Sequence, residues 1–348
     1  MKKVFVGLSG GVDSGVSAAL LKERGYDVTG VFIKIWQPEF IECTWREDRL
    51  DAMRVAAALG IPFREIDLSE EYKREVVEPM IADYARGITP NPDVLCNKSI
   101  KFGHFARWAF GEGADMVATG HYARVGSASC LLRGTDTNKD QSYFLHRITH
   151  DVLARTMFPI GDVMKADVRK LAVRFGLPVA TKPDSQGLCF VGDVTMKEFL
   201  RRYISIESGQ VIDMHDRIVG THDGAALYTR GQRHGFRVQG GVHYVVDVDT
   251  ANNIIRVSPD HADVLVSSVV LGDTHWINGV TPPHEVSVQT RYRENPIRAR
   301  LSDEGSVVRV TFSESHSATH GQSLVVYDND VCMGGGVIIK SCYNSTHE

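Results

Sequence analysis

The sequence predicts an α/β N-terminal domain built on a parallel sheet, Rossmann-like and carrying an anion loop, followed by two small β-rich domains. Three observations support this fold class. Strand and helix patterns alternate through the first half, a Ser/Gly loop joins the first strand directly to a helix, and short β-type runs dominate after about residue 205. At 348 residues the chain is long enough for two or three domains. We expect them at residues 1–204, 205–262 and 263–348.

The alternation of strand and helix patterns in the first half gives the position of each predicted element along the chain. Apolar β-type runs predict strands at residues 3–8, 27–35, 63–66 and 115–118. Amphipathic segments predict helices at residues 13–24, 46–59, 68–85, 100–110, 165–175 and 195–204. Strands that alternate with helices form parallel sheets with right-handed crossovers. A ligand is therefore expected at the carboxyl edge of the sheet.

The second half has the pattern of an all-β region. Gly, Asp and Asn turns separate runs at residues 242–248, 254–257, 264–270, 286–290, 307–312 and 324–327. These runs are short enough to form two small modules, which we expect to divide near residues 260–263.

Composition narrows the class of protein. Apolar residues make up 43% and charged residues 24%, as in ordinary globular proteins. No apolar run approaches the roughly 20 residues of a membrane span, and no signal-peptide pattern opens the chain, so a cytoplasmic location is expected. The six cysteines form no Cys-x-x-Cys pair, which argues against a zinc or iron–sulfur site and against a disulfide framework. With a net charge of −4, an RNA partner would need local basic patches.

The loop Ser-Gly-Gly-Val-Asp-Ser, residues 9–14, follows the first predicted strand. Glycines let the main chain approach a ligand, and the N–H groups of such a loop and of the helix start form an anion site. No Lys follows the glycines, so the P-loop pattern is absent. The plain alternative is a Gly/Ser turn. The order of residues resembles the pyrophosphate loop of the ATP pyrophosphatase superfamily, whose members adenylate an oxygen of a second substrate.

Two further motifs contain cysteines. In Thr-Pro-Asn-Pro-Asp-Val-Leu-Cys-Asn-Lys, residues 89–98, two prolines oppose a helix through Asn91. We therefore expect Asp93 and Cys96 on a rigid loop. Cys189 lies between glycines in Gly-Leu-Cys-Phe-Val-Gly, residues 187–192. The two thiols are distant in sequence, yet both belong to the predicted α/β half.

Together these motifs resemble the tRNA-specific 2-thiouridylase family. The resemblance is also carried by Ala-Thr-Gly-His-Tyr-Ala-Arg (118–124), Lys-Asp-Gln-Ser-Tyr-Phe-Leu (139–145), Tyr-Thr-Arg-Gly-Gln-Arg-His-Gly (228–235), Arg-Tyr-Arg (291–293), Gly-Gln-Ser (321–323) and Cys-Met-Gly-Gly-Gly (332–336). These matches run in order from residue 7 to about residue 338, so they cover nearly the whole chain.

The resemblance implies a tRNA-uridine 2-sulfurtransferase whose last module, at residues 263–348, is a barrel-like tRNA-binding domain. ATP would adenylate the C2 oxygen of the wobble uridine, and a persulfide sulfur would replace that oxygen. Cys96 would be the nucleophile, Cys189 the persulfide carrier and Asp93 the acid/base group. ATP, with Mg²⁺ expected from its phosphates, would be contacted by Gly7, Leu8, Ser9, Gly10, Gly11, Val12, Asp13, Ser14, Ile33 and Gly120. Transfer RNA would be contacted by Asn91, Pro92, Asp93, His121, Lys139, Asp140, Gln141, Arg291, Tyr292 and Gln322. A cysteine desulfurase or a relay protein would supply the sulfur. Ile33 stands where the family usually has Met.

Plainer interpretations stay open for several of these residues. Asp93 could close an Asx-turn, and His121 could be a satisfied loop histidine. Two basic sets fit either phosphate contact or a solvated face: Arg291, Arg293, Arg298 and Arg300 along a β-type segment, and Lys98, Lys101, His104 and Arg107 at helical spacing. For the whole chain, the alternatives are a small-molecule ligase of the GMP-synthase or argininosuccinate-synthase type, and a non-catalytic binding protein.

Overall fold

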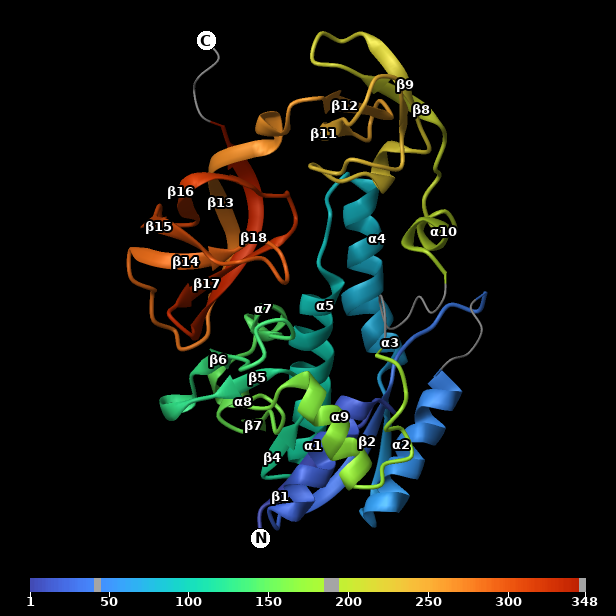
Figure 1. Cartoon of the computed structure of the whole chain (residues 1–348), viewed down its shortest axis with the longest axis vertical. Coiled ribbons are helices and arrows are strands. Elements are labelled where there is room, and N and C mark those ends of the chain that lie inside the picture. Colours follow the sequence, from blue (N-terminus) through green and yellow to red (C-terminus); the bar gives the residue numbers. More distant parts are fainter. Residues whose placement is uncertain (41–44, 185–193, 344–348) are drawn as a thin grey trace.

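The computed structural model describes residues 1–40, 45–184 and 194–343 (Figure 1). Its N-terminal part contains a parallel sheet of five strands in the order β3-β2-β1-β4-β7. The strands are β1 (Lys3–Gly7), β2 (Asp27–Lys34), β3 (Phe63–Asp67), β4 (Met116–Ala118) and β7 (Thr156–Met157). The predicted α/β class and its parallel sheet are confirmed. The two-residue strand β7 was not foreseen, because so short a run carries no periodicity.

Helices cover both faces of this sheet. One face packs on α1 (Val12–Glu23), α2 (Trp45–Leu59) and α9 (Lys165–Arg174). The other packs on α3 (Ser69–Tyr72), η1 (Lys73–Val77), α4 (Glu78–Ala85), η2 (Cys96–Phe105) and α6 (Ala106–Gly111). Successive strand residues point to opposite faces. Val4 and Val6 of β1 therefore enter the first core, whereas Phe5 enters the second.

The segment that carries Asp93 and Cys96 is helical, so the expectation of a rigid loop was wrong. The short helix α5 (Pro92–Leu95) runs directly into η2, a π-helix of ten residues that begins at Cys96. Pro92 takes the first helical position, where its missing N–H costs nothing. The Asn91 side chain caps the helix by accepting a hydrogen bond from the Val94 N–H at 3.3 Å. The helix expected from residue 100 thus begins eight residues earlier.

The second half contains two β-rich parts, as predicted. A five-stranded sheet has the order β10-β9-β8-β12-β11, with β8 (Gly209–Ile212), β9 (Ile218–His222), β10 (Arg237–Val238), β11 (Tyr244–Asp249) and β12 (Ile254–Ser258). A six-stranded antiparallel barrel then follows. Its strands are β13 (Leu265–Trp276), β14 (Glu285–Gln289), β15 (Ile297–Asp303), β16 (Val308–Ser317), β17 (Ser323–Asp328) and β18 (Val331–Cys342). Pairing of β13 with β18 closes the barrel.

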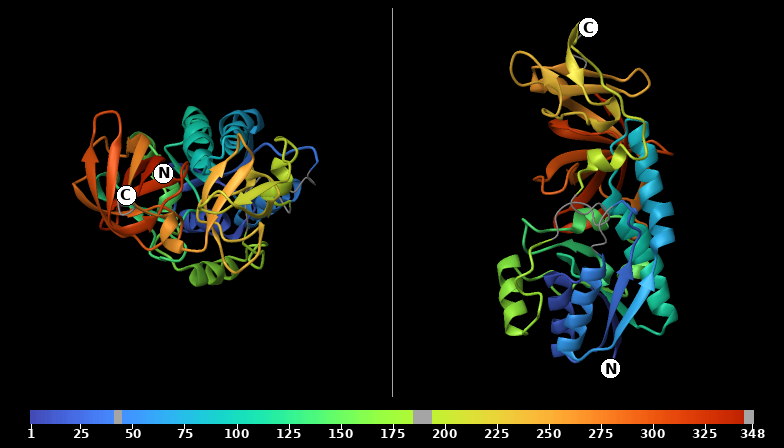
Figure 2. Two further views of the ribbon diagram at one scale, coloured as in Figure 1. Left: turned by 90° about the horizontal axis from the view of Figure 1, so that it is seen from above. Right: turned by 90° about the vertical axis from the view of Figure 1, so that its right-hand side faces the viewer.

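A hairpin from the first half extends the barrel sheet, which the sequence did not indicate. Strands β5 (Ala123–Val125) and β6 (Leu131–Arg133) pair with each other, and β6 pairs with β18. The short helices α7 (Ser142–Leu145) and α8 (His150–Leu153) follow this hairpin, and α10 (Met196–Leu200) precedes the central sheet. Figure 2 shows α4 running from the α/β part toward the central sheet at the far end of the molecule. None of the helices in the described part of the chain has the length and apolar character needed to span a bilayer.

Candidate active site

The loop of residues 9–14 lies at the carboxyl end of β1 and is closely packed. Gly10 has φ = +75°, and a Cβ at this position would lie 2.3 Å from the carbonyl oxygen of Asp48. Gly120 follows β4, and a Cβ there would lie 2.7 Å from the Ser14 nitrogen. Both positions therefore require glycine. The close approach of Gly120 joins the β4 edge to the start of α1.

The loop hydroxyls bond within the loop itself. The Ser14 hydroxyl accepts from the Ser9 N–H and donates to the Gly11 carbonyl, each at 3.2 Å. The first N–H groups of α1 have no intrahelical acceptor, because a helix leaves its first donors unpaired. They and the helix dipole favour an anion at this end. The side chains of Leu8 and Val12 are buried in the core, so only their backbone can face a ligand.

Two more of the expected ATP contacts flank this loop. Gly7 ends β1, and the Cδ1 atom of Ile33 lies 3.8 Å from where a Cβ on Gly7 would be. Ile33 is the penultimate residue of β2. Both positions therefore belong to the same carboxyl edge of the sheet as the loop.

A charged cluster adjoins the loop. The Lys165 ammonium of α9 lies 2.7 Å from Oδ1 of Asp13 and 2.9 Å from Oδ1 of Asp184. Lys139 at 2.9 Å and Arg169 at 2.5 Å also contact Asp184. Burial raises the pKa of Asp184, but the hydrogen bonds from Lys165 and Lys139 outweigh it and hold the pKa well below its usual range. Three cations thus share two carboxylates, which leaves positive charge beside the anion loop.

The Tyr122 side chain completes this cluster. Its hydroxyl donates to Oδ1 of Asp13 at 2.9 Å. Burial first, and then the charge of Asp13, raise the pKa of Tyr122, so the phenol stays protonated. Lys165, Arg169, Asp184 and Tyr122 were not singled out from the sequence. Lys165 and Arg169 lie on α9, Tyr122 follows β4 and Asp184 follows α9, and only the fold brings these segments to the loop.

Asp93, Lys101 and His121 form a second group. Burial raises the pKa of Asp93, and the charge of Lys101 partly opposes that rise. The Lys101 ammonium lies 3.4 Å from Nε2 of His121. Burial, reinforced by Lys101, lowers the pKa of His121 well below its ordinary value, so this buried imidazole is neutral. Its Nδ1 is 2.7 Å from the Thr119 hydroxyl.

Cys96 lies on η2 together with Lys101, directly after the short helix α5 that carries Asp93. Its side chain is buried where η2 begins. Lys101 follows it by five residues, which is the hydrogen-bonding interval of a π-helix, so the two residues are one turn apart. Cys189, the other expected catalytic thiol, lies outside the described residues.

Several expected tRNA contacts use their side chains inside the fold. The buried Asp140 carboxylate accepts from the backbone N–H groups of Gly134 at 2.9 Å and Ser142 at 3.0 Å. The Gln141 side-chain oxygen accepts from the Tyr122 N–H at 3.0 Å. Lys139 is paired with Asp184 as described above.

The basic segment of the barrel differs from its expected form. Arg291 and Arg293 lie in the turn between β14 and β15, and only Arg298 and Arg300 are on a strand. The reason is Glu294, whose carboxylate accepts from the backbone N–H groups of Thr290 and Arg291 and so closes the turn. The Arg291 guanidinium donates to the Ser317 hydroxyl at 3.0 Å, and Arg293 is exposed.

The remaining two expected contacts of the barrel face the first half. Tyr292 packs on Phe144 of α7, with ring centroids 4.5 Å apart. Gln322 reaches the segment that precedes α5.

The second basic set, at helical spacing, is also drawn into internal contacts. Lys101 faces His121, and Nε2 of His104 lies 3.0 Å from the Glu75 carboxylate. The Arg107 guanidinium is 3.2 Å from Nδ1 of His104. Of the four residues, only Lys98 is both exposed and without such a contact among the described residues.

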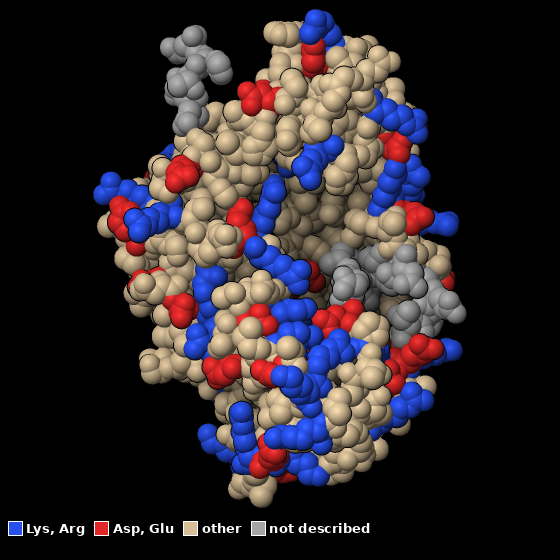
Figure 3. Space-filling view, in the orientation of Figure 1, with Lys and Arg blue, Asp and Glu red and all other residues tan. Residues whose placement is uncertain are grey.

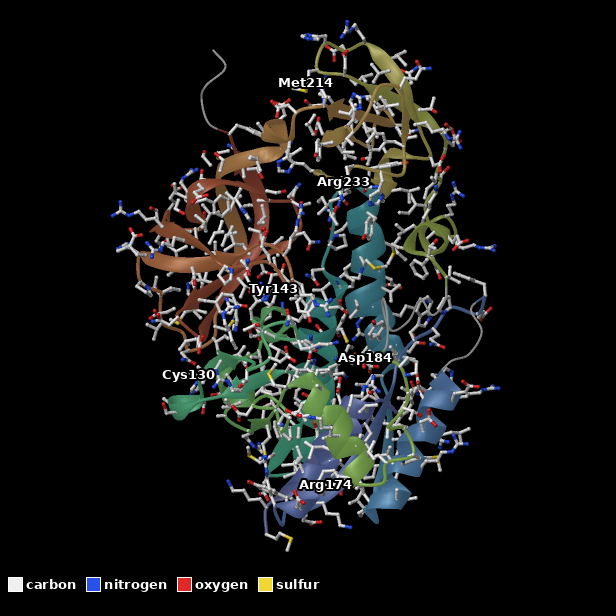
Figure 4. The ribbon with its side chains drawn as sticks, in the orientation of Figure 1. Cys130, Tyr143, Arg174, Asp184, Met214 and Arg233 are labelled. Carbon is white, nitrogen blue, oxygen red and sulfur yellow. The ribbon has the colours of Figure 1, made fainter. Side chains whose placement is uncertain are left out.

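A hollow lies between the three parts of the molecule. Figure 3 shows it on the front face, with lysine and arginine side chains along its edges. Asp184 and Arg233, labelled in Figure 4, lie on opposite sides of it. The charged cluster around Asp184 thus opens toward a space enclosed by the α/β part, the central sheet and the barrel.

Comparison with known proteins identifies the family. Residues 2–193 match the tRNA methyl transferase HUP domain, residues 197–259 the tRNA methyl transferase PRC-barrel domain, and residues 266–338 the aminomethyltransferase beta-barrel domain. The tRNA-specific 2-thiouridylase MnmA of Stenotrophomonas maltophilia (strain R551-3) is 46% identical over 97% of this chain and 93% of its own length. This chain belongs to the tRNA-specific 2-thiouridylase family.

Other relatives in this 2-thiouridylase family span the chain equally well. MnmA of Nitrosomonas eutropha is 43% identical and MnmA of Cupriavidus metallidurans 42%, each over 97% of this chain and 99% of its own length. Among solved structures, a 4-thiouridine synthetase in complex with RNA and ATP has a TM-score of 0.38 and 19% identity, covering 58% of this chain and 50% of that one. That likeness is too low to support an argument about function.

Proposed function

We propose that this chain catalyses the ATP-dependent 2-thiolation of the wobble uridine of tRNA. One observation carries the proposal: packing, a side-chain contact and a charge interaction connect the anion loop to the acid/base group. Gly120 packs on the start of α1, and the next residue, His121, contacts Lys101. Lys101 in turn acts on Asp93, and Cys96 lies one turn away on the same helix. An activated phosphate, a proton acceptor and a thiol would therefore meet at one place.

The first step would be adenylation of the uridine. The C2 oxygen is amide-like and a poor leaving group until it is bonded to the α-phosphorus of ATP. As O2 attacks phosphorus, the N3–H proton must leave, and the Asp93 carboxylate would take it. Pyrophosphate would leave toward the N–H groups of the loop and the ammonium groups of Lys165 and Lys139. The target base would have to leave its stack to reach this site.

Mg²⁺ is proposed only as a companion of the phosphates. Within the described ranges, no three His, Cys, Asp or Glu side chains gather as metal ligands. Asp13 supplies the carboxylate of the loop, and Lys165 already neutralises it. Mg²⁺ would therefore be held chiefly by phosphate oxygens and water, which is usual for this ion in ATP sites.

The second step would transfer sulfur. A cysteine desulfurase or a relay protein would load Cys189 as a persulfide. The Cys96 thiolate could attack the inner sulfur and release hydrosulfide, which displaces AMP from C2. Alternatively, the outer sulfur attacks C2 first, and Cys96 then cleaves the sulfur–sulfur bond to Cys189. Both routes end in 2-thiouridine, AMP and a Cys96–Cys189 disulfide, which an external thiol must reduce before the next turnover.

Residues beside the catalytic helix and in the barrel would hold the tRNA. Asn91 and Pro92 begin the helix of Asp93 and Cys96, so they would lie beside the target base. The exposed arginines of the turn after β14 suit phosphate contact. A cytoplasmic location, where tRNA is found, agrees with this activity.

Release of pyrophosphate from ATP tests the proposal and separates it from its alternatives. For a 2-thiouridylase, the release should depend on tRNA that carries an unmodified wobble uridine. A small-molecule ligase would release pyrophosphate without tRNA, and a non-catalytic binding protein would release none. Either of these last two results would contradict the proposal.

A further inference from the structure

The side chain of Gln322 crosses from the barrel to the segment that precedes the Asp93 helix. Its Nε2 donates to the backbone carbonyls of Thr89 and Pro90, each at 2.9 Å. The Gln322 backbone is fixed in the barrel by a 2.9 Å hydrogen bond from the Ile338 N–H to its carbonyl. The side chain thus joins the barrel to Thr89 and Pro90, which precede Gln322 by 233 and 232 residues in the chain.

The donor capacity of this amide is fully used. A glutamine amide nitrogen has two hydrogens, and the two carbonyls account for both. Only the amide oxygen remains, and it can only accept. Because phosphate oxygens are also acceptors, the Gln322 side chain has no donor left for a phosphate of RNA. This arrangement differs from the tRNA contact that the family resemblance implies.

Two other contacts hold the same segment. The Thr89 N–H donates to the His320 carbonyl of the barrel at 3.3 Å. The hydroxyl of Thr89 lies 2.8 Å from the hydroxyl of Thr229, which belongs to the central β-rich part. Thr89 is therefore held from both β-rich parts at once, and Pro90 is held from the barrel.

The segment has little freedom to absorb movement. Pro90 and Pro92 fix two of the backbone φ angles, and Asn91 between them caps α5. Asp93 and Cys96 follow within the next helical turn. A shift of Thr89 would consequently move the helix that carries both side chains.

We propose that Gln322 is a positioning residue, which fixes the start of the helix that carries Asp93 and Cys96. This inference rests on the proposed function for its kinetic consequence. It also gives the β-rich parts a second task besides binding: tRNA seated on them would be coupled, through Thr89 and Pro90, to the geometry of the catalytic residues.

The kinetic test uses the variants Gln322→Glu and Gln322→Ala in the full chain. Both remove the donor, and Glu keeps the size of the side chain. The single-turnover rate of thiolation should fall by about 10- to 100-fold, the usual effect of misplacing catalytic groups by an ångström. The Kd for tRNA should not change. Gln210→Glu, the same change at an exposed position on β8, is the matched control and should keep the wild-type rate.

The opposite result would identify a tRNA contact. In that case both variants would raise the Kd, Glu more than Ala because it repels phosphate, while bound tRNA would react at the normal rate. This pattern would overturn the proposal. Thr229→Val removes the hydroxyl contact from the other side, and a lower rate with unchanged Kd is expected here too. The Thr229→Val variant therefore tests the proposal even if the Gln322 variants fold poorly.

Hydrogen exchange gives a readout that needs no activity. In both Gln322 variants, peptides covering residues 88–96 should exchange faster than in the wild type, whereas peptides of β1 should not change. If the wild type lacks thiolation but the exchange rises as expected, the positioning role stands and the proposed function fails. Unchanged exchange over residues 88–96 would overturn the positioning role.

Discussion

The ammonium group of Lys165 holds both carboxylate oxygens of Asp13, at 2.7 Å and 2.9 Å. This pair connects α9 to the first turn of α1, beside the loop of residues 9–14. Without it, Asp13 would place a negative charge where the phosphates of ATP are expected. The pair therefore keeps the charge of the loop compatible with an anion.

The first prediction concerns this pair. Lys165→Met should leave Asp13 uncompensated and weaken the binding of ATP by roughly 1.5–3 kcal/mol, the typical worth of a hydrogen bond to a charged group. The ATP dependence of pyrophosphate release measures this as a higher KM. Lys170→Met on the same helix removes an exposed lysine that pairs with Asp167, and should change nothing. Equal KM values in the two variants would mean that Lys165 does not serve the ATP site.

A second prediction concerns the shape of the loop. Gly10→Ala should destabilise the fold by about 1–2 kcal/mol through its positive φ, and by a further 1–3 kcal/mol through the clash with the Asp48 carbonyl. Gly25 is the matched control, because its φ is +81° but no atom lies within 4 Å of its Cβ position. Gly25→Ala should show only the first loss. The free energies of unfolding in urea compare them, and identical losses would argue against tight packing at Gly10.

The sequence could predict the sheet because its strands alternate with helices within short distances along the chain. It could not predict the hairpin of β5 and β6. Those strands have three residues each, and they are stabilised by pairing with β18, about two hundred residues later. Strand β7 could not be predicted for the same reason, because it has two residues and depends on its pairing with β4. Local periodicity carries no information on such distant partners.

The candidate site also contains features that the sequence could predict and features that it could not. The loop of residues 9–14 could be recognised because its glycines and hydroxyls are adjacent. The helical start at Pro92 was misjudged, because proline opposes a helix before it but favours the first helical position. The contacts of Lys101 with His121, and of Lys165 with Asp13, join separate motifs. They depend on the packing of η2 and α9, which a single sequence does not specify.

A third prediction concerns RNA binding by the turn after β14. Arg293→Ala should weaken the binding of tRNA and lower its salt dependence by about one unit of slope for the lost phosphate contact. Arg291→Ala should act in the same direction. Arg174→Ala is the control, because Arg174 pairs with Glu23 and lies at the other end of the molecule (Figure 4). If both barrel variants keep the wild-type salt dependence of tRNA binding, this turn does not contact phosphate and is only solvated.

A fourth prediction concerns pH. A carboxylate base must be deprotonated, so the rate of adenylation should rise as pH rises through the pKa of Asp93. Lys101 lowers that pKa against the effect of burial. Lys101→Met should therefore move the acid limb of the pH–rate profile to higher pH, whereas Asp93→Asn should abolish that limb. An acid limb at the same pH in the wild type and in Lys101→Met would show that Lys101 does not affect the pKa of Asp93.

The free energy of unfolding should also depend on pH through Asp93, and the direction of its pKa shift gives the sign of that dependence. Burial raises the folded-state pKa of Asp93 above its unfolded value, so the folded protein favours the protonated form. The stability that Asp93 contributes relative to Asp93→Asn should be complete below the ordinary range of an aspartate. It should be lost as pH rises through the folded-state pKa. Urea unfolding of the two proteins across this range provides the check.

The wobble nucleoside itself gives the most direct test of the account. Mass analysis is made of tRNA that has been incubated with the protein, ATP, a thiol reductant and a persulfide-generating desulfurase with cysteine. The account predicts 2-thiouridine with the wild type and with Cys130→Ser, a cysteine outside the site, and none with Cys96→Ser, with Cys189→Ser or without ATP. Thiolation at a near wild-type rate in either catalytic cysteine variant, or a methylated uridine in place of a thiolated one, would contradict it.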